Sequence, residues 1–371
     1  MECLNCKKES PLIAKILGVC VECIRRDFEK VMPLIEKAHK VSRSNFCLPE
    51  GVPRDKGGVR CNICGNECQI PEGGFGYCGL RSNRLGKLVH LVSRERGSLS
   101  WYHDPLPTNC VAEWVCGERK SYGYKNLAVF YQGCSFDCLF CQNWHYREEV
   151  EQLMKRATPT VLENPETLRD ENFVTSEELS NCVDGRTNCI CYFGGDPVPH
   201  IYHALETSRL ALEKKRVRIC WETNGYMDSK FLKKIAELSL NSGGCIKFDL
   251  KAFSEEVNIA LCGVTNKRTL ENFSLLADYI KKRKEPPFLV ASTLLVPGYV
   301  DRFEVSKIAR FIASLDPEIP YSLLAFHPHF YMSDLPTTSR KHAEECLEEA
   351  EEAGVKRVKI GNIHLLSDDA Y

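Results

Sequence analysis

From residue 126 onward, short apolar runs alternate with amphipathic segments, and this alternation limits the folds open to the chain. The apolar runs predict strands at residues 126–132, 189–194, 217–223, 245–250, 288–296, 321–326 and 357–360. The amphipathic segments predict helices at residues 175–183, 199–214, 229–240, 267–284, 302–315 and 340–353. This alternation favours an α/β fold with a parallel sheet and right-handed crossovers. Since six or seven strands are too few for a closed (β/α)8 barrel, we expect a partial (β/α)6-type parallel barrel.

The residues before 126 have a different composition, which divides the chain into three parts. We expect residues 1–60 to form a four-cysteine metal module and a helix near residues 24–40, ending in a linker-like stretch at 48–58. Residues 61–125 are rich in Cys, Gly, Trp and Tyr and are expected to pack on the barrel of residues 126–371. Residues 147–174 are polar and charged without a strand pattern, and we expect a surface excursion there.

Whole-chain composition excludes several classes of protein. The hydrophobic share of 43% and charged share of 27% are those of an ordinary soluble globular protein, and a net charge of −1 gives no strong nucleic-acid signal. No apolar run approaches the roughly 18 residues needed to span a bilayer. Because the N-terminus lacks the apolar core of a signal peptide, we expect a cytoplasmic protein without a membrane partner.

The 21 cysteines are unusual for a chain of 371 residues. Disulfide scaffolds are usually short and carry an export signal, whereas these cysteines fall in closely spaced groups in a long chain without one. Closely spaced thiols in a reducing compartment favour metal binding.

One group, Cys134, Cys138 and Cys141, follows the first predicted barrel strand at C-x3-C-x2-C spacing. Three thiolates on one short loop can hold three irons of a [4Fe–4S] cluster and leave the fourth iron open for a cofactor or substrate. Barrels keep their chemistry in the loops that follow strand ends, where this loop lies. The alternative is a three-cysteine zinc site completed by a distant ligand.

This loop resembles the cluster-binding loop of the radical S-adenosylmethionine (SAM) superfamily, and the resemblance extends over residues 126–362. It implies that the open iron takes the amino and carboxylate groups of SAM, and that a low-potential electron donor reduces the cluster. Electron transfer then breaks a C–S bond of SAM and releases a 5′-deoxyadenosyl radical.

Four further segments at predicted strand ends resemble parts of the superfamily that contact SAM. They are Gly194-Gly195-Asp196-Pro197, the polar end at 222–225, the Asp-x-Lys element at 249–251 and the Pro-Gly turn at 297–298. Asp196 stands where the family usually has glutamate. The resemblance implies cofactor contacts by Phe140, Gly194, Gly195, Asp196, Thr223, Asn224, Asp249, Lys251 and Pro297. His327, after the sixth predicted strand, is a further candidate, with a structural role as the alternative.

A narrower resemblance, to the AmmeMemoRadiSam-system enzymes and their pyruvate formate-lyase activating relatives, covers residues 61–362. It rests on Cys61, Cys64, Cys68 and Cys78 with the glycines between them, on residues 141–144 and on the segments at 326–337 and 361–362. The chain departs from it at Asp196, in residues 147–174 and in the segment before residue 60.

Two other groups of four cysteines are candidates for further metal sites. Cys3, Cys6, Cys20 and Cys23 form two C-x2-C turns with a 13-residue spacer, which suits one tetrahedral zinc or mononuclear iron. Cys61, Cys64, Cys68 and Cys78 form a possible second site, which would take zinc, a single iron, an iron–sulfur cluster or no metal.

The remaining candidates are single residues. Cys110 and Cys116 are candidates for metal ligands or substrate contacts. We predict that Cys182, Cys189, Cys191, Cys220, Cys245, Cys262 and Cys346 are small buried core residues. The aromatic residues Trp101, Tyr102, Tyr122 and Tyr131 either line a substrate channel or fill the core.

These patterns together predict an enzyme that cleaves SAM reductively and uses the adenosyl radical to abstract hydrogen. The expected partner is a protein, which the enzyme modifies or activates. One alternative is a radical C-methyltransferase with cobalamin as methyl donor, although the chain has no Asp-x-His-x-x-Gly motif. The other is a zinc-stabilised binding or scaffold protein without radical chemistry.

Overall fold

The main sheet of the protein is a curved, largely parallel one. The structure is a computed structural model that describes residues 1–108, 110–369 and 371. Within these residues the sheet has nine strands in the order β13-β12-β11-β10-β9-β8-β6-β5-β7. From β6 to β13 every neighbouring pair is parallel, which confirms the predicted α/β partial barrel. The parallel strands are β6 (Lys125–Tyr131), β8 (Thr187–Gly194), β9 (Arg218–Thr223), β10 (Ile246–Asp249), β11 (Leu289–Leu295), β12 (Tyr321–Ala325) and β13 (Val358–Gly361).

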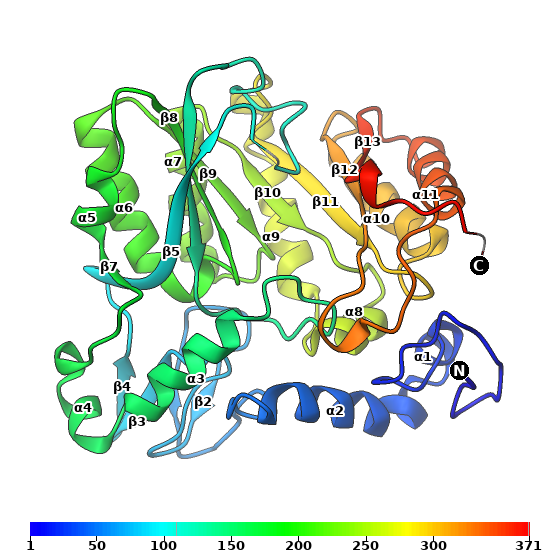
Figure 1. Cartoon of the computed structure of the whole chain (residues 1–371), viewed down its shortest axis with the longest axis horizontal. Helices are drawn as coiled ribbons and strands as arrows, with labels where there is room; N and C mark the ends of the chain where they lie inside the picture. Colours follow the sequence, from blue (N-terminus) through cyan, green and yellow to red (C-terminus); the bar gives the residue numbers. More distant parts are fainter. Residues whose placement is uncertain (109, 370) are drawn as a thin grey trace.

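Helices alternate with these strands along the chain and surround the sheet (Figure 1). They are α5 (Ser176–Asn181), α6 (Ile201–Lys214), α7 (Ser229–Ser242), α8 (Glu255–Cys262), α9 (Lys267–Ala277), α10 (Arg302–Leu315) and α11 (Arg340–Glu352). Helix α10 matches its prediction at both ends. Helix α9 ends at Ala277, short of the predicted residue 284, and the short 3-10 turn η3 (Ile280–Lys282) follows it. Helix α8 was not predicted.

The edge of the sheet beyond β6 is antiparallel. Strand β5 (Arg96–Pro105) pairs with β6 along Leu99–Pro105, and β7 (Phe173–Thr175) pairs with β5 only along Arg96–Ser98. The Leu99 amide donates a hydrogen bond to the Asn172 carbonyl just after β7 pairing ends. From Leu99 to the end of β5 at Pro105, no described strand pairs with the outer edge of β5. Residues 61–125 therefore supply one strand of the barrel sheet, the hairpin of β3 (Arg81–Arg84) with β4 (Lys87–His90), and strand β2 (Gln69–Ile70), which pairs with β1 (Val59–Arg60) of the preceding segment.

The expectation of a surface excursion at residues 147–174 is wrong for its first half. This region contains α3 (Tyr146–Arg156), α4 (Pro159–Glu163) and the 3-10 turn η1 (Pro165–Thr167). Helix α3 buries Arg147, Val150 and Leu153 under the cysteine loop and the hairpins. Its charged residues misled the prediction because most of them occupy the opposite, solvent-facing side of the helix.

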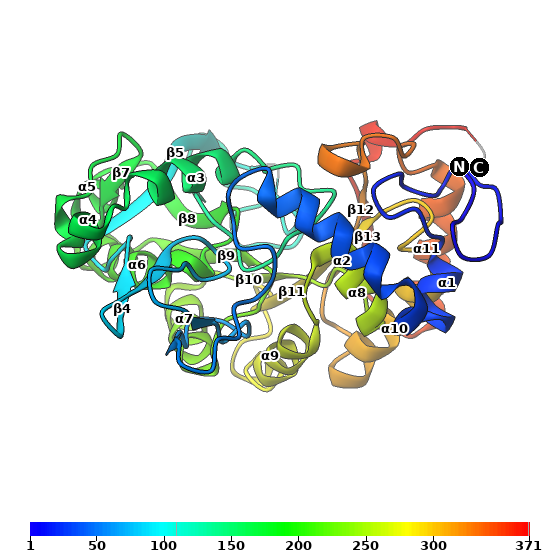
Figure 2. The same cartoon turned by 90° about the horizontal axis from the view of Figure 1, so that it is seen from below.

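The N-terminal segment is anchored to the barrel. Helices α1 (Val21–Arg26) and α2 (Phe28–Ser44) run close to α8, and Figure 2 shows α2 crossing the barrel beneath its strand ends. Both oxygens of Asp301 accept hydrogen bonds of 2.8 Å from the Arg25 guanidinium. The buried Tyr299 hydroxyl donates to the Val19 carbonyl and accepts from the Ala14 amide. Among the described residues, none of the helices combines the length and the apolar character of a membrane span.

Candidate active site

The three cysteines of the loop after β6 lie around one cavity. Cys134, Cys138 and Cys141 line a space of about 310 Å³, within the range of small-molecule sites. The chain enters the loop through Gly133, whose φ of 123° is favourable only for glycine. Burial raises the pKa of the Cys134 and Cys141 thiols, to about 11 for Cys141, whereas the hydrogen bond to Cys262, together with burial, raises the pKa of Cys138. A metal that binds these thiols would therefore have to displace their protons.

Asp137, between two of these cysteines, holds the loop in place. Its fully buried carboxylate lies 2.5 Å from Arg147 Nη1 of α3 and 2.8 Å from His39 Nδ1 of α2, and it accepts a hydrogen bond from Ser42. Burial alone would raise the pKa of Asp137, but Arg147, His39 and Arg43 outweigh it and hold that pKa below its ordinary value. Two separate helices therefore fix the cysteine loop through one carboxylate.

The Gly-Gly-Asp segment after β8 lies directly against the start of the cysteine loop. The Gly195 amide donates to the Tyr131 carbonyl at 3.0 Å, and the Asp196 amide donates to the Gly133 carbonyl at 2.9 Å. A Cβ at Gly195 would lie 2.3 Å from the Gly133 oxygen, closer than any side chain tolerates. Only glycine fits at position 195 because its backbone lies directly against the backbone at Gly133.

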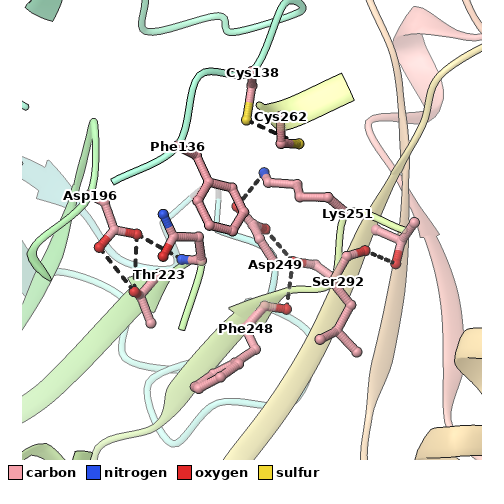
Figure 3. A network of polar contacts seen from close by, with 12 residues as sticks. Phe136, Cys138, Asp196, Thr223, Phe248, Asp249, Lys251, Cys262 and Ser292 are labelled. Atoms are coloured by element: carbon pink, nitrogen blue, oxygen red, sulfur yellow. Dashed lines mark hydrogen bonds and ion pairs between the residues drawn. The ribbon is translucent and has the colours of Figure 1, made fainter. Parts of the chain in front are cut away.

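Asp196 connects this segment to the end of β9 (Figure 3). Its carboxylate accepts hydrogen bonds from the Thr223 hydroxyl at 3.0 Å and from the Asn224 amide at 2.7 Å. Burial outweighs these hydrogen bonds and raises the pKa of Asp196 to about 6. The Asn224 side-chain amide lies 3.0 Å from Ser135 Oγ and 3.6 Å from Cys134 Sγ, so the strand end reaches the cysteine loop.

Asp249 and Lys251, at the end of β10, form an ion pair on the opposite wall (Figure 3). Lys251 Nζ lies 2.7 Å from Asp249 Oδ2, and the Ser292 hydroxyl donates to Asp249 Oδ1 at 2.7 Å. Burial opposes the charge of Lys251, but Asp249 and the nearby Cys138 raise its pKa and keep it protonated. The Cys262 sulfur lies 3.5 Å from that of Cys138.

The structure brings most of the predicted cofactor residues together. Those that line the cavity with the three cysteines are Phe140, Gly194, Gly195, Asp196, Thr223, Asn224, Asp249 and Lys251. Pro297 and His327 do not line it. Pro297 is buried in a turn covered by the N-terminal segment, where Leu12 packs against Gly298, and His327 is exposed beside His329.

Other residues of the site were missed or only partly foreseen. Glu222, Phe130 and Phe193 line the cavity because inward and outward side chains alternate along each strand. Of the aromatic channel candidates, Tyr102 lines the cavity, whereas Tyr131 is buried and bonds to His203. Trp101 and Tyr122 are exposed and do not line it. Neither Arg147 nor His39 belongs to a recognisable sequence motif, and only the folded chain places them beside Asp137.

The four N-terminal cysteines have the geometry of a single-ion site. The Cys3 and Cys23 sulfurs are 3.8 Å apart, and those of Cys6 and Cys20 are 3.7 Å apart. A tetrahedral ion with metal–sulfur bonds of about 2.3 Å needs sulfurs about 3.8 Å apart. These four thiols therefore fit one tetrahedral metal ion.

The other cysteine groups are spaced differently. In the described part of the chain, only the N-terminal group brings three or more ligand atoms within 4.8 Å of one another. Cys134, Cys138 and Cys141 are more widely spread around their cavity, which fits a polynuclear cluster in which each thiolate binds its own iron. Cys61, Cys64, Cys68 and Cys78 line one cavity of about 20 Å³ together with Arg81, and a metal there stays a prediction.

Comparison with known proteins agrees with this geometry. Residues 128–312 match the family described as the Radical SAM superfamily. The chain belongs to the radical SAM superfamily. It is 28% identical over 313 residues to an uncharacterized protein of Methanocaldococcus jannaschii. That alignment covers 83% of each of the two chains. The chain is 26% identical over 220 residues to the pyruvate formate-lyase 1-activating enzyme of Escherichia coli, covering 57% of this chain and 78% of that one.

Among solved structures, this radical SAM chain is similar to a domain of pyruvate-formate lyase-activating enzyme from Bacteroides vulgatus. The TM-score is 0.39 at 19% identity, covering 47% of this chain and 99% of that chain. Membership of the superfamily implies SAM and a [4Fe–4S] cluster as cofactors, and SAM cleavage with radical chemistry as the activity. It argues against the alternative of a scaffold protein without radical chemistry.

Proposed function

We propose that this radical SAM enzyme abstracts hydrogen from an extended segment of a protein, which it thereby modifies or activates. The observation that carries the proposal is the position of the free edge of β5 at the rim of the cavity. Tyr102 and Asp104 of β5 both line the cavity, and the strand beyond Leu99 has no described neighbour on its outer side. A free edge of this kind can bind an extended peptide through backbone hydrogen bonds, while side-chain pockets select its sequence.

An aromatic wall leads from this rim into the cavity. The Tyr102 ring is 52% exposed and stacks on Phe130 at a centroid distance of 5.6 Å, and Phe130 stacks on Phe193 at 5.4 Å. Such a wall offers a substrate side chain an apolar path from solvent to the radical site. It also keeps water away from the place where the adenosyl radical must react.

The chain's own residues have distinct roles in this proposal. Cys134, Cys138 and Cys141 would hold the [4Fe–4S] cluster, which supplies the electron that breaks the C–S bond of SAM. Asn224 and the Gly194–Gly195 backbone would bind and orient SAM, since they face the cavity beside Cys134. Lys251 keeps its proton on Nζ and offers a positive charge to the SAM carboxylate, with Asp249 holding it in position.

The activating-enzyme relative supports a protein as substrate. The E. coli enzyme is named for the activation of pyruvate formate-lyase 1, which is itself a protein. The cobalamin-dependent methyltransferase alternative has no support among the described residues, and we do not propose it.

An isotope experiment tests the proposal. The reduced enzyme and SAM are incubated with protein and small-molecule fractions of an extract from cells grown on deuterated amino acids. We expect deuterium in 5′-deoxyadenosine with the protein fraction, and its loss when that fraction is first digested to free amino acids. Transfer from the small-molecule fraction alone would contradict a protein substrate.

A further inference from the structure

Four cysteines of the segment before the barrel surround one small cavity. They are Cys61, Cys64, Cys68 and Cys78, called the Cys61 group below, and none of them forms a disulfide. The pairing of β1 with β2 brings the first of them back to the third, because the Cys61 amide donates to the Cys68 carbonyl at 2.9 Å. The chain then returns, and the Tyr77 amide, next to Cys78, donates to the Cys68 sulfur at 3.4 Å. The local fold therefore gathers four thiols from one short stretch of chain.

A buried arginine lines the same cavity without a partner for its charge. Arg81 is 2% exposed, and its two Nη atoms donate only to the carbonyls of Leu80 and Pro199. Its Nε has no hydrogen-bond partner, and none of the ion pairs of the described residues includes Arg81. An unpaired guanidinium is costly to bury beside four neutral thiols. The charge would be balanced if these thiols were the thiolates of an anionic metal centre.

The spacing of the thiols favours a polynuclear cluster over a single ion. In the described chain only the N-terminal cysteines bring three or more ligand atoms within 4.8 Å of one another, so no three sulfurs of the Cys61 group are close enough for one tetrahedral ion. In an iron–sulfur cluster each thiolate binds its own iron, and the sulfurs lie further apart.

The size of the cavity suits a compact inorganic core. The centre of a water-sized sphere can move through about 20 Å³ of it. Because such a sphere has a radius of about 1.4 Å, the cavity itself is about 6 Å across. That width admits a small cluster between the four thiols and is too small for an organic cofactor.

We propose that the Cys61 group holds a second [4Fe–4S] cluster, in which a thiolate binds each of the four irons. Two ferrous ions, two ferric ions and four sulfides make the core, and each thiol gives up its proton when it binds an iron. Four thiolates give the whole centre a net negative charge, which Arg81 offsets. Unlike the radical cluster at Cys134, Cys138 and Cys141, this cluster has no open iron and would not bind SAM.

The second site lies directly against the cysteine loop of the radical cluster. Asn66 lines the cavity of the Cys61 group, and its side-chain amide donates at 2.7 Å to the carbonyl of Ser135, the residue after Cys134. The Gly65 amide donates to the Tyr226 carbonyl at 2.7 Å, which ties the same turn to the segment after β9. None of the Cys61 group lines the radical cavity, so the two clusters would be neighbours without sharing a ligand.

The first test counts acid-labile sulfide, which a single-ion site does not bind. Full-length protein is reconstituted anaerobically with ferrous iron, ferric iron and sulfide. Wild type is compared with the variant Cys134→Ala/Cys138→Ala/Cys141→Ala, which lacks the radical cluster. We expect about eight sulfides per chain in wild type and about four in the variant, since each [4Fe–4S] cluster holds four. Four in wild type and none in the variant would overturn the proposal.

Further substitutions in that variant locate the second cluster. Adding Cys64→Ala/Cys68→Ala should remove the remaining sulfide, whereas adding Cys346→Ala should leave it in place. Cys346 is the matched control because it is buried in α11, outside both cavities. Sulfide that survives the loss of Cys64 and Cys68 would overturn the assignment to these cysteines.

A spectroscopic measurement uses only wild-type protein, so that a misfolded variant cannot decide the result. Mössbauer spectra of protein reconstituted with ⁵⁷Fe are recorded with and without SAM, which is expected to bind only the open iron of the radical cluster. We expect SAM to change the signal of about one cluster iron in eight. A change in about one in four would mean that the radical cluster is alone, and would overturn the proposal.

Discussion

Asp137 lies inside the cysteine loop, yet its partners come from helices that are distant in the sequence. Arg147 belongs to α3, and His39 belongs to α2, almost a hundred residues before the loop. Both partners are buried, so removing the carboxylate would leave Arg147 with an uncompensated charge. The loop that is expected to hold the cluster therefore depends on side chains that no local motif includes.

The variant Asp137→Asn tests this dependence. We expect it to lower the free energy of unfolding by roughly 3–5 kcal/mol, the usual cost of breaking a buried ion pair from one side. Urea denaturation followed by circular dichroism measures the change. The control Glu213→Gln breaks the exposed pair with Arg209 and should change the free energy of unfolding much less, because solvent screens exposed ion pairs. A loss for Asp137→Asn no larger than that of the control would contradict the anchoring role.

His203 gives a prediction for pH. Burial lowers its pKa from 6.5 to about 4, so the folded protein keeps the ring neutral over a range in which the unfolded chain takes up a proton. The free energy of unfolding should therefore decrease as the pH falls from about 6.5 to about 4. Because each pKa unit corresponds to about 1.36 kcal/mol, the total decrease should be about 3 kcal/mol. Urea midpoints across this range should fall less steeply in His203→Gln than in wild type. The exposed His364→Gln should leave the slope unchanged.

Tyr102 tests the substrate path. In Tyr102→Ala, deuterium transfer from protein substrate to 5′-deoxyadenosine should fall about tenfold, because an aromatic contact of about 1.4 kcal/mol is lost. SAM cleavage without protein should change less than twofold. Tyr122→Ala is the matched control, since Tyr122 is exposed and does not line the cavity. Equal transfer by the two variants would contradict a substrate path along β5.

At the scale of elements, the N-terminal segment acts as a buttress for the barrel. Helix α1 holds α10 through Arg25, whose side chain is only 19% exposed, while α2 carries His39 to the cysteine loop. The four-cysteine group lies at the start of this segment. A metal there would stabilise the helices that support the active site.

The variant Arg25→Ala tests the attachment of this segment. Losing the paired hydrogen bonds to Asp301 should cost about 1.5–3 kcal/mol locally. Proteolytic cleavage within residues 1–45 should then become at least tenfold faster, because each 1.4 kcal/mol lost raises the locally unfolded population about tenfold. Arg26→Ala, which removes the exposed neighbouring arginine, should leave the cleavage rate unchanged. Unchanged cleavage in Arg25→Ala would mean that other contacts hold the segment.

The elements that could be predicted are those whose pattern is local. All seven parallel strands were foreseen because their apolar runs are short and bounded by turns. Helix α8 was missed because it is mostly apolar and carries little amphipathic signal. Pro297 does not line the cavity, since a strand-end motif shows that a turn exists but not which neighbouring segment covers it.

At the scale of the whole molecule, the cysteines gather in separate places in the fold. The N-terminal cysteines are spaced for one ion, and the loop after β6 is spaced for a polynuclear cluster beside a cavity of about 310 Å³. A third set, Cys110, Cys191, Cys220 and Cys245, lines a smaller interior cavity together with Lys247, whose ion pair with Glu222 lies between the two cavities. The sequence grouped cysteines only by their spacing along the chain, so it could identify the first two groups and not the third.

The central claim is that Cys134, Cys138 and Cys141 hold the cluster that cleaves SAM. The most direct measurement is 5′-deoxyadenosine released from SAM by anaerobically reconstituted, dithionite-reduced protein, compared among wild type, Cys138→Ala and the control Cys182→Ala. The account predicts product from wild type and Cys182→Ala, and a loss of at least a hundredfold in Cys138→Ala, as expected when a group essential for the reaction is removed. Equal product from Cys138→Ala and wild type would contradict it.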